Sequence, residues 1–202
     1  MTMDKRSDRS ADEIGLSLHE RALRKRRKDG YIPDAFLKII AQSGPILGEC
    51  TDSKHPNEIP VEAFEFDVHT DVVREHLRAG QREYDVHPGG IAAEGLYFVT
   101  RISKATVALW NQMMQGLPPM PKAILSCRRP GRQEEDFLII TMEQVDVARI
   151  KTMDTGEDDP TPICLVHLVF DLHRMDYREH KADGSASGKH AAGYDYKQHK
   201  AV

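Results

Sequence analysis

A run of 17 residues near the C-terminus, "PICLVHLVFDLHRMDYR" (162–178), constrains the fold more than any other segment. Its apolar residues alternate along the chain, which is typical of a β-strand with one buried face. At about 3.3 Å per residue, a straight strand of this length would extend roughly 55 Å. A globular body of this size is only about 40 Å across. The strand must therefore bend.

The alternation also indicates where the bend falls. Two sets of apolar residues have opposite parity: Cys164, Val166, Leu168, Phe170 and Leu172 in the first set, and Met175 and Tyr177 in the second. The change of parity lies near His173. A long bent strand that takes part in two sheets is typical of the corner of a barrel or sandwich. Residues 34–202 are therefore predicted to form one mainly β domain, a small β-barrel of two packed sheets.

Other segments of this domain are strand-like as well. Strands are predicted at 35–41, 58–69, 96–102, 122–128 and 136–150. Within "EIPVEAFEFDVH" (58–69) the parity slips, and a bulge near Ala63 would turn both apolar sets toward the core. Residues 70–95 contain "PGG" and are predicted to be a long loop.

The segment "SKATVALWNQMMQG" (103–116) predicts one α-helix on the flank of the barrel. Ser103 can cap the helix, and Val107, Trp110 and Met114 recur at helical spacing. Gly116 is expected to end it.

The first 33 residues differ in composition from the rest. Residues 1–30 carry nine Lys and Arg against six Asp and Glu, whereas the remainder carries 19 against 26. A short helix is predicted at 17–29, with a thin apolar face of Leu18 and Ala22. We expect a basic N-terminal extension, residues 1–33, that is mobile or ordered only by a partner. Its basic arm consists of Arg21, Arg24, Lys25, Arg26, Arg27 and Lys28.

Composition narrows the cellular setting. The three cysteines are far apart and form no CxxC pair, which favours a reduced compartment over a disulfide framework. No apolar run approaches the roughly 20 residues that span a bilayer, and the N-terminal residues lack the apolar core of a signal peptide. No membrane span and no signal-peptide export are expected.

The segment "ECTDSKHPNE" (49–58) and His69 offer candidate metal ligands: Cys50, Asp52, His55, Glu58 and His69. Metal-binding His and Cys usually recur at tighter, repeated spacings, and this segment is rich in turn-forming residues. A polar loop between strands is therefore the favoured interpretation. His167 is expected to be a hydrogen-bonded core group. A metal-dependent hydrolase that uses the histidines remains a weaker alternative, so no catalytic, cofactor-binding or metal-binding residue is assigned, and the chain is not expected to be an enzyme.

Four stretches in order resemble the haemolysin-coregulated protein family (Hcp), the tube subunits of type VI secretion systems. They are "AFLKI…GPILGECTDSKHPNEIPVEAFEFDV", "LYFVTRISKATVALW", "PTPICLVHLVFDLHRMDY" and the C-terminal "KADGSASGKHAAGYDYKQHKAV". The chain departs from the family in its N-terminal extension, in the charged 70–95 segment, and in having Ser103 where the family often has Asp.

The resemblance implies a barrel that assembles into a hexameric ring. Such rings stack into a tube inside a contractile sheath, and the tube is fired from the cytoplasm together with a spike and effectors, some carried in its lumen. Residues of the 70–95 segment, Arg78, Arg82 and Tyr84, are expected at the ring or stacking interface, because exposed Arg and Tyr favour protein contacts. The alternative is a specialised binding module whose basic arm recruits an acidic effector, a chaperone or, less expectedly, nucleic acid.

Overall fold

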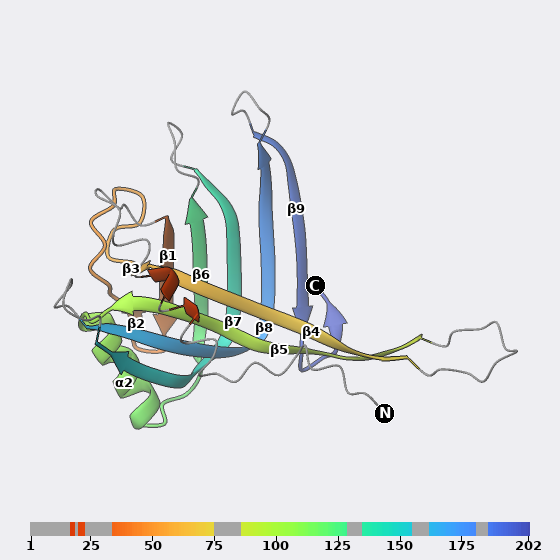
Figure 1. The fold of residues 1–202 in the computed structure, drawn as a ribbon, viewed down its shortest axis with the longest axis horizontal. Coiled ribbons are helices and arrows are strands. Elements are labelled where there is room, and N and C mark those ends of the chain that lie inside the picture. The colour runs from red at the N-terminus through yellow and green to blue at the C-terminus, as the bar shows by residue number, and fades with distance from the viewer. Residues whose placement is uncertain are drawn as a thin grey trace, which may run out of the picture.

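The computed structural model describes residues 17, 18, 20–22, 34–74, 86–128, 135–154, 162–180 and 186–202. The strands are β1 (Ala35–Ala41), β2 (Gly44–Ile46), β3 (Ile59–Val61), β4 (Ala63–Arg74), β5 (Val86–Arg101), β6 (Met120–Arg128), β7 (Asp136–Met153), β8 (Ile163–His180), β9 (Ala186–Asp195) and β10 (Lys200–Ala201). One helix, α2 (Lys104–Met114), flanks them (Figure 1). In this part of the chain, no helix has the length and apolar character needed to cross a membrane.

The strands form one continuous antiparallel sheet that closes on itself. From β6 the ladder runs through β7, β8 and β5 to β4, and in the other direction through β1 to β3. Only Glu62 separates β3 from β4, and its N–H already bonds the carbonyl of Val99 at 2.9 Å. The predicted mainly β barrel with a helix on its flank is confirmed.

Two long neighbouring strands, β7 and β8, bend together and belong to both layers of the barrel (Figure 1). In β8 the buried side chains change parity from Leu168 and Phe170 to His173, so the bend predicted near His173 is confirmed. In β7 the change falls between Met142 and Val145, where Gln144 has a φ of 54°. The left-handed conformation of this single residue lets the strand turn without losing its register with β8.

The predicted parity slip near Ala63 is also confirmed. Ile59 and Val61 of β3 pack in the barrel core, and so do the rings of Phe64 and Phe66 in β4. Ala63 faces the opposite way, toward a second apolar cluster outside the barrel. The chain therefore changes from one layer to the other at Glu62, where β3 ends and β4 begins.

The prediction of a long loop at 70–95 is wrong at both of its ends. β4 continues to Arg74 and β5 begins at Val86, and together they form a two-stranded arm that projects from the barrel (Figure 1). We define the arm as residues 68–74 and 86–93. Beyond the barrel neither face of a ribbon has to be apolar, so the sequence shows little of the alternation that identifies a half-buried strand. Residues 75–85 lie outside the described residues.

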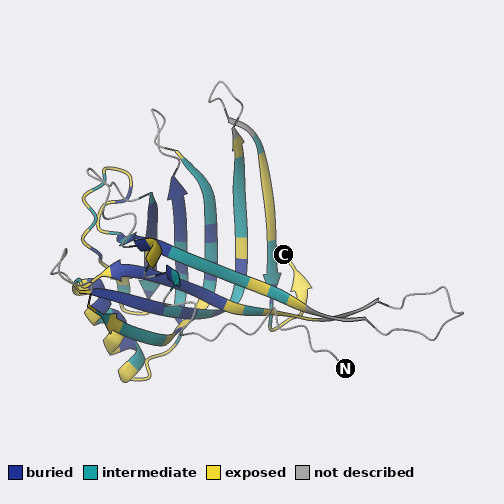
Figure 2. Ribbon diagram, in the orientation of Figure 1, coloured by how far each residue is buried: buried dark blue, intermediate teal, exposed yellow. Residues whose placement is uncertain are grey.

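The helix prediction at 103–116 is confirmed, and the apolar residues that recur at helical spacing lie outside its buried face. Ala105 and Leu109 are buried against the barrel, whereas Val107, Trp110 and Met114 are exposed (Figure 2). Ser103 is the N-cap residue. Its backbone N–H donates to the Thr106 hydroxyl at 3.0 Å, which begins the helix.

Candidate functional site

The loop between β2 and β3 holds the polar residues that suggested a metal site. Asp52 accepts two hydrogen bonds from the Arg128 guanidinium of β6, at 2.7 and 2.9 Å. Its Oδ1 also accepts the backbone N–H of Lys54 at 2.8 Å. These bonds stabilise the carboxylate, and they hold the pKa of Asp52 far below its usual range. The Asp52 carboxylate therefore attaches the loop to β6 of the barrel.

His55 fastens the same loop at a second point. Its Nδ1 lies 2.8 Å from Glu58 Oε2, and its Nε2 lies 3.2 Å from Asp136 Oδ1 at the start of β7. The ring stacks on Phe36 of β1, with centroids 4.2 Å apart, and the Arg128 guanidinium lies 5.0 Å from the same Phe36 ring centroid.

This arrangement corresponds to the polar connection favoured by the sequence. Asp52, His55 and Glu58 come together, but His69 lies on β4, paired with Ala92. Among the side chains that the structure describes, no three or more His, Cys, Asp or Glu are grouped so that they could hold a metal ion. Arg128 and Asp136, the partners that define the site, were missed, because only the fold brings them to the loop.

Two histidines of β8 occupy apolar surroundings. His167 stacks on Tyr97, with centroids 3.8 Å apart, and its Nε2–H donates to the Glu94 carbonyl at 2.6 Å. It is hydrogen-bonded as predicted, but it lies on the outer face of the sheet. His173 Nδ1 forms a hydrogen bond of 2.9 Å with the Tyr196 hydroxyl. Burial lowers the pKa of both histidines and raises the pKa of Tyr196 to about 12.

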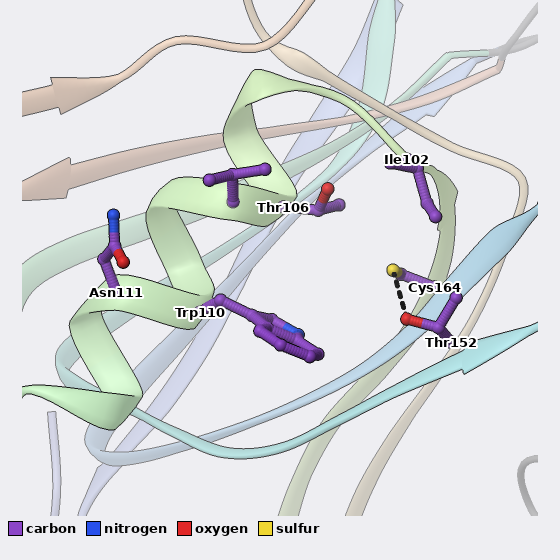
Figure 3. A pocket seen from close by; sticks show the side chains of 7 residues that line it. Ile102, Thr106, Trp110, Asn111, Thr152 and Cys164 are labelled. Atoms are coloured by element: carbon purple, nitrogen blue, oxygen red, sulfur yellow. Dashed lines mark hydrogen bonds between the residues drawn. The ribbon is translucent and has the colours of Figure 1, made fainter.

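An exposed apolar surface lies along α2. Val107, Trp110 and Met114 are joined by Ile102 before the helix and Leu117 after it, and all five are exposed. A groove of about 230 Å³ runs beside this surface (Figure 3), lined by Ile102, Thr106, Val107, Trp110, Asn111, Thr152 and Cys164. At its floor, the Thr152 hydroxyl lies 3.6 Å from Cys164 Sγ. The lining is mostly apolar, so the surface suits contact with protein rather than chemistry.

Most of the residues assigned to interfaces from the sequence lie outside the described residues. These are Arg78, Arg82 and Tyr84, and also Arg24, Lys25, Arg26, Arg27 and Lys28 of the basic arm. Arg21 is described, and its Nη2 lies 3.0 Å from Glu65 Oε2 of β4. Leu18 and Ala22, two of the described residues of the predicted N-terminal helix, pack on the barrel of their own chain. The expectation that the extension as a whole is mobile or ordered only by a partner stays a prediction. The predicted domain boundary at residue 33 stays a prediction.

The comparisons with known proteins agree on one group. The family described as "Type VI secretion system effector, Hcp" matches residues 36–177. Protein hcp1 of Pseudomonas aeruginosa is 30% identical over 156 residues, which cover 77% of this chain and 89% of that protein. The crystal structure of Hcp1 from Salmonella typhimurium covers 85% of this chain and is itself fully covered, with a TM-score of 0.64 and 27% identity. A structure titled as a type six secretion system protein has the same coverage, with a TM-score of 0.73 at 19% identity.

Proposed function

Because the chain belongs to the Hcp family of type VI secretion system proteins, we propose that it is a structural subunit of the secretion tube. In this role the chain assembles into rings of six copies, and the rings stack. The observation that carries the proposal is the family match over residues 36–177, which includes both bent strands of the barrel. The chain acts through its surfaces rather than by catalysis.

Two surfaces of the described residues support assembly. Within the arm, β4 pairs with β5 along one edge, and its other edge pairs with no strand among the described residues. Open edges of this kind readily bind further protein. In Figure 1, α2, which carries the exposed apolar residues, and the arm lie toward opposite ends of the barrel. Different surfaces on opposite sides of one subunit are what a head-to-tail ring requires.

In the proposed tube, the arm contacts neighbouring copies, and Arg78, Arg82 and Tyr84 of the 70–95 segment are proposed to take part in the same interface. A contractile sheath surrounds the tube and a spike closes its end. Contraction ejects the tube from the cytoplasm, with effectors inside its lumen or attached to its end. Ejection of this kind requires no disulfide and no signal peptide.

Light scattering of the purified protein tests the proposal. A species with about six times the mass of the 22.9 kDa chain, together with ring-shaped particles in negative-stain micrographs, is expected. A protein that stays monomeric at millimolar concentration and forms no rings with type VI sheath and spike proteins present would contradict it.

A further inference from the structure

The outer face of the sheet made by β4, β5 and β8 is apolar. Along β5, Tyr97 and Val99 point away from the barrel core, and along β8 Ile163 and Leu165 do the same. With Ala63 of β4 they form a cluster in which each residue is at most 5% exposed. The solvent side of an antiparallel sheet is normally polar. An apolar outer face of this kind is expected to pack against another element.

The N-terminal helical segment (residues 17, 18 and 20–22) lies on this face. Leu18 and Ala22 belong to the same cluster, and both are 0% exposed. Their i, i+4 spacing places them on one side of a helix, one turn apart. The small side chains of Ala22 and Ala63 allow the helix backbone to approach the sheet closely.

A polar contact orients the segment on the sheet. Arg21 Nη2 lies 3.0 Å from Glu65 Oε2, whose side chain belongs to β4, and 3.0 Å from Ser17 Oγ one turn earlier in the segment. The side chain of Glu65 is mostly buried, whereas that of Arg21 is half exposed. The apolar cluster joins the segment to residues of β4, β5 and β8, and the ion pair adds a polar contact to β4.

We infer that the outer face of β4, β5 and β8 is a helix-docking site, occupied by residues 17–22 of the same chain, which anchor the start of the basic arm to the outside of the barrel. The docking residues lie before the first residue of the family match, at position 36. The docking segment is therefore outside the part of the chain that the family match covers, whereas the face that it occupies lies within the match. The site does not depend on the proposed function, because every contact lies within one chain.

A buried thiol in the full-length chain tests the site. Val99→Cys would place a thiol under the segment, and its labelling by a maleimide can be followed by mass spectrometry separately from Cys50, Cys127 and Cys164. Adding Leu18→Asp should accelerate labelling at least about tenfold, since the charged side chain removes the segment from the face. Leu47→Asp makes the same change at an exposed leucine, and should leave the rate unchanged.

Charge reversal supplies a second variant that does not touch the apolar contact. Arg21→Glu should accelerate labelling several-fold, and Glu65→Arg in the same chain should restore most of the protection. Equal labelling rates in the native and Leu18→Asp backgrounds, with both chains folded by circular dichroism, would overturn the site. Protection that is lost on dilution would also overturn it, because the segment would then come from a second copy.

Discussion

At the scale of single residues, largely buried charged groups stabilise the attachment of the β2–β3 loop to the barrel. Arg128 is only 8% exposed and is matched by Asp52, which a long loop brings to it. The loop carries both Asp52 and His55, and their partners come from β6 and β7. The loop therefore holds the start of β7 against the barrel.

Removal of one partner of the buried pair is expected to be costly. Asp52→Ala leaves the Arg128 charge without its carboxylate, and it should lower the free energy of unfolding by about 3–5 kcal/mol. Urea denaturation measures this. The matched control is Asp176→Ala, which removes the partner of Arg174, a side chain more than half exposed. It should cost no more than about 1 kcal/mol. Equal effects of the two changes would contradict the role given to the buried pair.

The two histidines of β8 predict how the free energy of unfolding depends on pH. Because burial lowers the pKa of His167 and His173 in the folded state, the unfolded chain binds more protons as the pH falls below the usual histidine value. The free energy of unfolding should therefore decrease between about pH 7 and pH 5. The pKa of Asp52 is lowered as well, but from the lower value of a carboxylic acid, so its contribution to stability is lost only at lower pH, below about 4.

Urea denaturation at pH 7.5 and pH 5.5 checks this. His173→Gln should reduce the difference between the free energies of unfolding at the two pH values, because glutamine does not ionise and so has no charged form that burial disfavours. His199→Asn, at an exposed position with a φ of 50°, is the control and should leave the difference as it is. An unchanged difference in His173→Gln would show that another group is responsible.

At the scale of elements, β5 depends on close packing where the arm leaves the barrel. Gly95 has a φ of 111°, and a Cβ at this position would collide with the Leu168 carbonyl oxygen of β8 and with the His167 ring. The neighbouring strand can approach β5 only because the side chain is missing. β5 also contains Gly90, where an added Cβ would meet open space.

These two glycines form a matched pair for substitution. Gly95→Ala should lower the free energy of unfolding by at least about 2 kcal/mol, because it adds both backbone strain and a clash with backbone. Gly90→Ala should change it by no more than about 0.5 kcal/mol. Thermal unfolding of both variants provides the comparison, and a tolerated Gly95→Ala would show that β5 and β8 pack more loosely than described.

The elements also show how far the sequence predicts this fold. The bend in β8 and the parity slip near Ala63 could be predicted, because each leaves an apolar pattern that only one local geometry satisfies. The arm could not, because exposed strands carry no such pattern. The buried face of α2 cannot be predicted from apolar spacing, because Val107, Trp110 and Met114 are exposed, whereas the polar residues Thr106 and Gln112 are buried. The loop was identified correctly, but its partners Arg128 and Asp136 are distant in sequence.

At the scale of the whole molecule, surfaces that the single chain leaves open matter most. In the arm, Val68 of β4 and Ile91 of β5 are exposed apolar residues. A monomer gains nothing from such side chains, whereas an assembled tube can bury them.

A double substitution in the arm tests this at the level of assembly. Val68→Glu with Ile91→Glu should abolish ring formation in light scattering, because charges resist burial between copies. It should change the free energy of unfolding of the single chain by no more than about 1 kcal/mol. Leu47→Glu alters an exposed leucine outside the arm, and rings should persist. Rings that form normally in the double variant would place the contacts elsewhere.

The shared bend of β7 and β8 has a mechanical consequence for the barrel. Since the same two strands run through both layers, neither layer can separate from the other without pulling apart hydrogen bonds in both. The described barrel should therefore melt in a single cooperative transition. Backbone amides on either side of Gln144 should therefore exchange with deuterium at the same opening free energy. For the same reason, a force applied at one end of the barrel should be resisted by both layers together.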